Sequence, residues 1–294
     1  MRTPLVRLQD DGAAEIFLKL ENLQPIGSFK LRGAGNAFAL ADEHRLAAGV
    51  WTASAGNMAQ AVAWHARERE LPCAVVIPET APQTKRDAIA RLGAELVEVP
   101  FATWVEVFRT RSYPGMEGFF VHPFSDPAVM AGNGTIGLEI AEDLPDVEAV
   151  LVPYGGGGLC CGIASALREL APDCTVHTCE VETAAPLAAS LEAGEPVEVA
   201  HKPSFVDGIG APTVFPEMFE LARQLVDGSI VVGLDEIASA VRLLVERNRV
   251  VAEGAGAASV AAALTRQEGK LVCVVSGGNL DTAVLQTILA GKTP

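Results

Sequence analysis

The 294-residue chain has few basic residues, with 22 lysines and arginines against 37 aspartates and glutamates and a formal net charge of −15. Because the phosphates of nucleic acids are bound by clustered lysines and arginines, this balance argues against a nucleic-acid partner. The N-terminus also lacks the apolar core of a signal peptide, and we therefore expect a cytoplasmic protein.

A run suited to crossing a membrane is also missing. The stretch between Glu148 and Arg168 carries no charge, but it contains Pro153 and four consecutive glycines, which fit a membrane helix poorly. We expect no membrane partner. With 49% hydrophobic residues, the chain can instead bury a large core and is long enough for two packed lobes.

The common signatures of metal and disulfide sites are absent as well. The six cysteines form no CxxC pair, and the adjacent Cys160 and Cys161 suit neither a disulfide framework nor a zinc site. No HExxH motif is present among the five histidines. We expect reduced thiols in the core and histidines that are structural or exposed.

Strand-like and helical patterns alternate along the whole chain, which predicts an α/β fold with parallel sheets covered by helices. Apolar runs typical of strands cover residues 16–20, 73–77, 95–99, 149–152 and 271–275. Amphipathic patterns typical of helices cover residues 58–70, 85–92 and 235–248. No low-complexity linker or solenoid repeat marks a domain boundary.

Lys30 lies between the strand-like run 16–20 and a predicted helix, with Gly27 and Gly33 on either side. These glycines allow a tight turn and close helix packing, so the amine would be held at the mouth of a sheet. A desolvated lysine held there can lose its proton and condense with an aldehyde. The alternative is a surface lysine that opens a helix.

Four glycines, residues 155–158, follow a buried strand and precede a helical pattern. Exposed backbone N–H groups and a helix N-terminus together predict a site for a phosphate. No Lys-Ser/Thr pair follows, which excludes a nucleoside-triphosphate loop. Cys160 and Cys161 stand where a dinucleotide fingerprint requires its third glycine.

Two turns of the same form follow predicted strands, at residues 54–57 and 276–279. Each places a hydroxyl and an amide at the carboxyl end of a strand, where open α/β sheets bind ligands, although each could also be an ordinary turn. The first turn approaches the nucleophile elbow of serine hydrolases. Thr52 replaces the first glycine of that motif, and no histidine or acid is placed to complete it.

Together, the lysine segment, the glycine run and the two turns resemble, in order and spacing, the fold-type II pyridoxal-phosphate (PLP) enzymes, and most closely the threonine/serine dehydratase and serine racemase branch. The resemblance extends to residues 78–82, 122–124, 131–137 and 207–208. It implies a two-lobed fold like that of the tryptophan synthase β-subunit, and a homodimer. The expected lobes are a large one of residues 1–48 and 127–294 and a small mobile one of residues 49–126, with the cofactor in the cleft between them.

The resemblance also implies how PLP is bound. Lys30 would carry it covalently, Phe29 would pack against its ring and Asn57 would hydrogen-bond the ring hydroxyl. Ser276 would face the pyridine nitrogen. Glu253 would lie on the same side of the ring, and the resemblance does not define its function there. The phosphate would be held by Gly155, Gly156, Gly157, Gly158 and the amide of Leu159.

The implied activity is β-elimination from a 3-hydroxy amino acid of the L-threonine or L-serine type, giving a 2-oxo acid and ammonia. The substrate carboxylate would meet Ser54, Ala55, Gly56 and Asn57. A serine at the ring nitrogen is a poor proton source, which favours prompt loss of the β-hydroxyl over transamination. The alternatives are a serine-type racemase, a β-replacement lyase of the cysteine synthase type, and a binding protein that only retains the fold.

Several residues depart from the family pattern. Met58 replaces the usual histidine and Asn133 the usual glutamine, which leaves the shape of the substrate pocket open. Relatives that bind magnesium or calcium use a glutamate at Glu180, a carbonyl at Ala184 and a carboxylate where this chain has Pro186. Proline offers no side-chain oxygen, so we expect weak or absent binding of a divalent metal.

Overall fold

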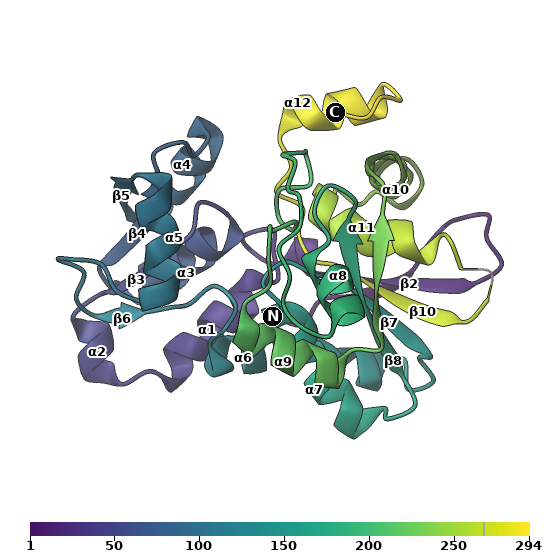
Figure 1. Cartoon of the computed structure of the whole chain (residues 1–294), viewed down its shortest axis with the longest axis horizontal. Helices are drawn as coiled ribbons and strands as arrows, with labels where there is room; N and C mark the ends of the chain where they lie inside the picture. The colour runs from purple at the N-terminus through teal and green to yellow at the C-terminus, as the bar shows by residue number, and fades with distance from the viewer. Residues whose placement is uncertain (267) are drawn as a thin grey trace. The chain divides into compact units, whose positions relative to one another are not determined.

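The computed structural model describes residues 1–266 and 268–294, which form two compact units (Figure 1). The larger unit comprises Met1–Phe29 and Gly134–Pro294, and the smaller unit comprises Lys30–Asn133. These bounds differ from the expected lobe boundaries at residues 48 and 126. The reason is that helix α1 (Lys30–Leu40) packs on α3 (Asn57–Glu68) and so groups with the smaller unit.

The larger unit is built on a six-stranded sheet with the strand order β1-β2-β10-β7-β8-β9. All neighbouring strands are parallel except β1, which pairs antiparallel with β2. The expected α/β fold with parallel sheets is therefore confirmed. The strands are β1 (Leu5–Arg7), β2 (Glu15–Leu20), β7 (Ala149–Pro153), β8 (Thr175–Val181), β9 (Gly228–Val232) and β10 (Lys270–Val275).

Side chains alternate between the two faces of this sheet along each strand, and both faces are buried. Leu151, Cys179 and Cys273 belong to one core cluster with residues of α10 and α11, whereas Val150 and Val152 are fully buried outside that cluster. The helices of this unit are α7 (Gly158–Leu170), α8 (Pro186–Ala193), α9 (Pro216–Leu225), α10 (Leu234–Asn248), α11 (Gly254–Ala263) and α12 (Thr282–Leu289), with a short 3-10 helix at Glu21–Leu23. Helix α6 (Pro127–Asp143) begins in the smaller unit and ends in the larger one.

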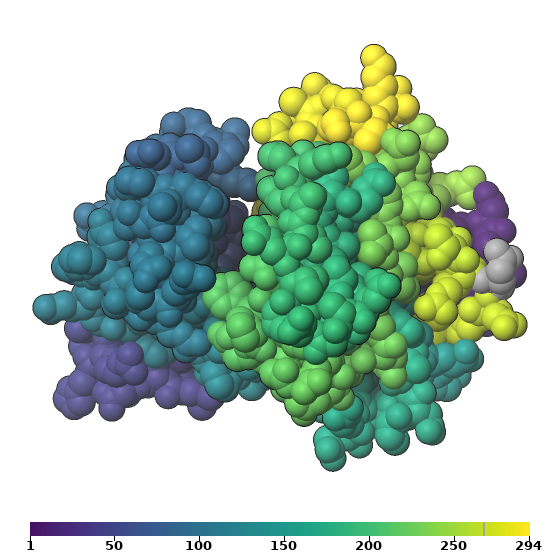
Figure 2. Space-filling model, viewed as in Figure 1, coloured from purple at the N-terminus to yellow at the C-terminus, as the bar shows by residue number. Residues whose placement is uncertain are grey.

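Helix α11 is the central helix of the larger unit and is buried along its whole length. It consists almost entirely of alanine and glycine, so it can approach the sheet closely. A Cβ atom at Gly256 would lie 2.5 Å from the carbonyl oxygen of Gly277, a separation that requires glycine. By contrast, α12 packs on α10 and lies at the surface of the larger unit, in yellow in Figure 2.

The smaller unit contains a four-stranded parallel sheet with the strand order β5-β4-β3-β6. Its strands are β3 (Val50–Ala53), β4 (Cys73–Pro78), β5 (Glu95–Val99) and β6 (Phe119–Phe120). Its other helices are α2 (Glu43–Ala47), α4 (Gln83–Ala90) and α5 (Phe101–Thr110). Apolar residues of α3 and α5 pack against this sheet in two clusters.

Membrane-spanning helices and the state of the cysteines can be examined in the described residues. No helix in the described part of the chain is long and apolar enough to cross a membrane. The six cysteines are all free thiols, and four of them are buried, at positions 160, 161, 179 and 273.

Candidate active site

The glycine run forms the turn between β7 and α7 in the larger unit. Gly157 stands at the N-cap of α7 with a φ of +87°, a left-handed conformation that favours glycine. A Cβ atom there would lie 3.1 Å from Cε of Met218 and 3.3 Å from the ring of Tyr154. A side chain at Gly157 would therefore be crowded as well as strained.

This turn fits a phosphate group. Gly157, the N-cap residue, has no side chain to cap α7, and the first turn of the helix carries no acidic residue. The N-terminal N–H groups and the helix dipole favour an anion at this place. A Cβ at Gly155 would meet the carbonyl oxygen of Gly208 at 3.2 Å, so a side chain would be crowded here too.

Ser276, which follows β10, lies close to the start of the lysine segment. The amide of Phe29 donates to the carbonyl of Ser276 at 3.0 Å, and Ser28 forms a β-bridge with Gly277. The amide of Glu253 donates to the carbonyl of Gly277 at 3.0 Å. The larger unit thus brings Phe29, Ser276 and Glu253 together around one turn, with Ser276 and Glu253 buried.

Lys30 is the first residue of α1 in the smaller unit and is half-buried. Its Nζ donates to the carbonyl oxygen of Pro123 at 2.6 Å. The boundary between the two units falls at the peptide bond between Phe29 and Lys30, so the predicted site residues are divided between the units. Those of the larger unit are Phe29, Gly155, Gly156, Gly157, Gly158, Leu159 and Ser276, and those of the smaller unit are Lys30, Ser54, Ala55, Gly56 and Asn57.

The predicted carboxylate-binding turn lies between β3 and α3. The amide of Gly56 donates to Oγ of Ser54 at 3.2 Å, and α3 begins at Asn57. A Cβ at Gly56 would meet nothing within 4 Å, so this turn borders open space. The N-terminus of a helix favours a negative group, such as a carboxylate, at this end.

The two departures from the family pattern both lie in packed surroundings. Met58 is only 1% exposed. Asn133 is also buried, and a Cβ at Gly33 would lie 2.8 Å from its Oδ1, so Asn133 packs against α1 where that helix has a glycine.

The carboxylate of Glu180 serves a helix terminus in this structure. It accepts hydrogen bonds from the amides of Leu187 at 2.8 Å and Ala188 at 2.7 Å, and from Oγ of Ser229 at 2.7 Å. Burial raises the pKa of this carboxyl group. Pro186 opens α8, and Glu182 accepts from the amide of Leu234 at 2.8 Å.

Glu180, the carboxylate that the resemblance implies for a divalent metal, has other partners in this structure. Both oxygens of Glu180 already accept hydrogen bonds, and the carboxylate expected at position 186 is a proline. In the ranges 1–266 and 268–294, no group of three or more histidine, cysteine, aspartate or glutamate side chains is arranged to hold a metal ion. Ala184 is buried and donates its amide to the carbonyl of Val181 at 3.0 Å.

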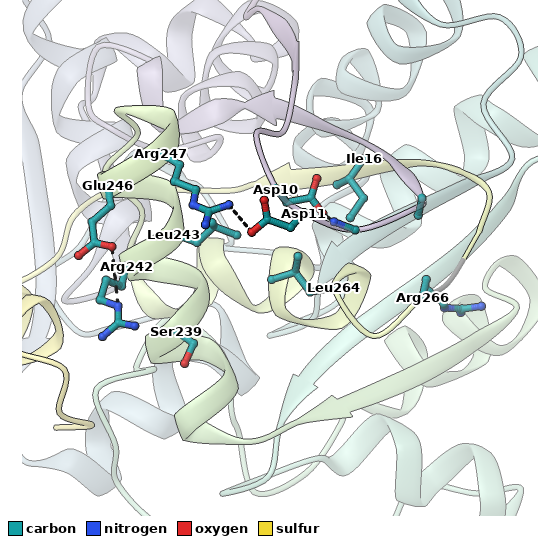
Figure 3. A pocket seen from close by; sticks show the side chains of 12 residues that line it. Asp10, Asp11, Ile16, Ser239, Arg242, Leu243, Glu246, Arg247, Leu264 and Arg266 are labelled. Atoms are coloured by element: carbon teal, nitrogen blue, oxygen red, sulfur yellow. Dashed lines mark hydrogen bonds and ion pairs between the residues drawn. The ribbon is translucent and has the colours of Figure 1, made fainter.

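A surface pocket of about 410 Å³ lies elsewhere in the larger unit, between α10 and the loop before β2 (Figure 3). It contains none of the predicted site residues. Two of its arginines point toward acidic neighbours, with Arg247 at 2.7 Å from Asp11 and Arg242 at 3.9 Å from Glu246. We therefore assign the pocket no part in the reaction.

Sequence reasoning gave no role to His122, which the structure places in a turn beside Lys30. This residue is 2% exposed. Burial, followed by the charges of Arg111 and Lys30, lowers its pKa to about 3. The segment of residues 122–124 was noted only as part of the resemblance, and no local pattern links it to a lysine far away in the sequence.

Comparison with known proteins places the chain in a family. Residues 1–277 match the model of the pyridoxal-phosphate dependent enzymes. The chain is 42% identical over 288 residues to L-threonine ammonia-lyase of Thermotoga maritima, covering 96% of this chain and 71% of that protein. It is 39% identical over 281 residues to the catabolic L-threonine dehydratase of Escherichia coli K12, covering 93% of this chain and 85% of that protein.

Solved structures agree with this match. Threonine deaminase isoform 2 from Solanum lycopersicum has a TM-score of 0.89 and 33% identity, covering 99% of this chain and 88% of that one. Maize serine racemase has a TM-score of 0.88 and 30% identity, covering 99% and 92%. The chain therefore belongs to the pyridoxal-phosphate dependent enzyme family. Within that family it is a lyase of the threonine dehydratase branch, and PLP is its cofactor.

Proposed function

We propose that this lyase acts on L-threonine or L-serine, removes the β-hydroxyl group, and releases a 2-oxo acid and ammonia. The observation that carries the proposal is the 42% identity to an L-threonine ammonia-lyase over 96% of this chain. The predicted lysine segment, glycine turn and Ser276 all lie within the 1–277 family match.

The residues proposed to hold PLP each have a physical reason. Lys30 would bind it covalently, and the glycine turn with the Leu159 amide would hold its phosphate at the N-terminus of α7. Phe29 would pack on the ring, Asn57 would bind its hydroxyl, and Ser276 would face its nitrogen. When bound, PLP accepts the electron pair left at the substrate Cα after proton removal.

Lys30 is also the proposed base. When its amine is not bonded to the cofactor, it would take the Cα proton of the substrate. The hydroxyl of Ser276 is a poor proton donor to a pyridine nitrogen, which favours departure of the β-hydroxyl over transamination. The substrate carboxylate would be bound at residues 54–57 by backbone N–H groups, the hydroxyl of Ser54 and the start of α3.

Further proposals concern the whole molecule. We expect closure of the smaller mobile lobe over the substrate, which would exclude water during the reaction. A homodimer is proposed from the resemblance and from the prevalence of two-fold assemblies. We also propose a cytoplasmic location.

A racemase is the second candidate, favoured by the likeness to maize serine racemase and to a PLP-dependent aspartate racemase with a TM-score of 0.85 and 31% identity. Racemisation requires an acid that returns a proton to the opposite face of Cα. The resemblance to serine racemases places a serine hydroxyl at the position of Ala55, and a methyl group cannot deliver a proton. We therefore rank elimination first.

The proposal is tested by incubating the purified enzyme with a panel of 3-hydroxy amino acids. Release of 2-oxo acid and ammonia is measured, and chiral chromatography follows the D-amino acid. We expect 2-oxo acid from L-threonine or L-serine, and a loss of several orders of magnitude in Lys30→Ala, since a covalent anchor and a base are removed together. Formation of D-serine faster than oxo acid would contradict the proposal.

A further inference from the structure

Lys30 contacts a buried turn within the smaller unit. Its Nζ donates to the carbonyl oxygen of Pro123 at 2.6 Å, although the two residues are 93 positions apart in the sequence. Pro123 itself is buried. A short hydrogen bond from an amine to a buried backbone carbonyl orients the amine, provided that the carbonyl is itself fixed.

His122 fixes this carbonyl by closing the turn around it. Its Nδ1 accepts a hydrogen bond from the amide of Ser125 at 2.9 Å and lies 3.4 Å from the amide of Phe124. The hydroxyl of Ser125 is 2.9 Å from the same nitrogen, and Arg111 donates to that hydroxyl at 3.0 Å. The ring of His122, just before Pro123, therefore contacts the amides of the two residues that follow Pro123.

The same contacts assign the protonation state of His122. Since Nδ1 accepts from an amide, the ring proton is on Nε2, and the backbone of Phe108 also forms a hydrogen bond with the ring. The ring packs against the aromatic rings of Phe108, Phe120 and Phe124, with centroids 6.2, 6.0 and 4.6 Å away. A second positive charge beside Lys30 is thus avoided, because burial keeps this imidazole neutral.

We propose that His122 is a positioning residue for Lys30: it holds the turn of residues 122–125 so that the Pro123 carbonyl receives the Lys30 amine whenever that amine is not bonded to the cofactor. The inference rests on the proposed function, in which Lys30 binds PLP and acts as the base. After the amine has taken a proton, the carbonyl dipole stabilises the resulting ammonium and keeps it from swinging toward solvent.

The test measures the reactivity of Lys30 after release of the cofactor. The holoenzyme is treated with hydroxylamine, its fold is checked by circular dichroism, and it is briefly exposed to acetic anhydride. Mass spectrometry then gives the acetylation rate of Lys30 relative to Lys202 and Lys292, two exposed lysines of the larger unit. Rebinding of PLP, followed by visible absorbance, provides a second readout.

Two substitutions separate the turn-closing role from simple filling of space. His122→Leu keeps an apolar side chain but removes the acceptor for the Ser125 amide, whereas His122→Asn supplies an oxygen that can accept that bond in place of Nδ1. His44→Gln, at an exposed histidine of α2, is the matched control. We expect a roughly tenfold rise in the relative rate for Lys30 in His122→Leu, the scale of one hydrogen bond to a charged group, and little change in His122→Asn and His44→Gln.

An unchanged rate in His122→Leu, or an equal rise in His122→Asn, would overturn the inference. If His122→Leu does not fold, Ser125→Ala removes only the hydroxyl that lies between Nδ1 and Arg111. We expect a smaller rise in that variant, of about two- to threefold, and an unchanged rate would again overturn the inference. Failure of the proposed function would appear separately, as absent oxo acid release or a cofactor attached to another lysine.

Discussion

The carboxylate of Glu180 accepts a hydrogen bond from the backbone amide of Leu187 at 2.8 Å, so the acid for which the resemblance implies a metal stabilises the start of a helix. A negative group at a helix N-terminus is favoured by the unpaired amides and the helix dipole. Pro186 lies in the first turn of α8, at the position where the resemblance implies a second carboxylate for a metal.

We predict that divalent metals are not required. Dialysis against a chelator should leave the activity and the melting temperature unchanged, and added magnesium should raise neither. Glu180→Gln should lower the free energy of unfolding by about 1–3 kcal/mol, because the amide nitrogen cannot accept from α8 as the carboxylate does. Activity or stability that collapses on chelation and returns with magnesium would show that a metal site survives despite Pro186.

A second prediction concerns Gly157 in the phosphate turn. Gly157→Ala adds a Cβ in a left-handed conformation and within 3.1 Å of Met218, so it should lower stability by roughly 1–3 kcal/mol and weaken PLP binding. Gly194→Ala is the matched control, because Gly194 also has a positive φ, +78°, but open space around its Cβ position.

Both variants should share the cost of backbone strain, and only Gly157→Ala should lose affinity for PLP. The measurements are thermal unfolding and spectroscopic titration of the cofactor-free protein with PLP, with inorganic phosphate as a competitor. Equal PLP affinity in the two variants would remove the glycine turn from the cofactor site.

The third prediction is a pH dependence that originates at His122. Its pKa is about 3 in the folded protein and 6.5 ordinarily, so the unfolded chain binds the proton more tightly. The stabilisation is fully present above pH 6.5 and is lost as the pH falls toward 3, by about 1.4 kcal/mol per pH unit. Denaturant unfolding at a series of pH values should show this slope in the parent and a shallower one in His122→Asn. Parallel curves would mean that His122 is not held neutral.

A fourth prediction concerns Ala55. Elimination from L-serine should far outpace formation of D-serine in the parent enzyme. Ala55→Ser introduces a hydroxyl that can return a proton to Cα, and it should raise the trace of racemisation while Lys30 continues to support elimination. Chiral chromatography of timed samples decides this, and Gly93→Ser, at an unrelated turn, serves as the control. Unchanged D-serine formation in Ala55→Ser would contradict the claim that the missing hydroxyl at position 55 limits racemisation.

The alternating pattern of the sequence predicted the main strands well, because parallel strands buried on both faces are continuous apolar runs. The strands expected at residues 95–99 and 271–275 correspond to β5 and β10. Strand β8 was not among them, since it carries the polar residues His177, Thr178 and Glu180. The side chains of Thr178 and Glu180 form hydrogen bonds with residues far away in the sequence or beyond the strand. Helix α11 shows no periodicity because it is buried on all sides.

In the candidate site, features with a local sequence pattern were predictable, and features that depend on contacts between distant residues were not. The glycine turn was predictable, because four glycines between a strand and a helix are a local pattern with a direct physical meaning. The role of His122 was not, because it depends on a contact between Lys30 and Pro123 that only the fold creates. Likewise, no sequence pattern shows that Glu180 would cap α8.

The central claim is that Lys30 binds PLP. Borohydride reduction of the purified holoenzyme fixes the cofactor to its lysine, and peptide mapping by mass spectrometry then locates it. The account predicts a single labelled peptide that contains Lys30, and no label in Lys30→Ala. A label on any other lysine, in either protein, would contradict it.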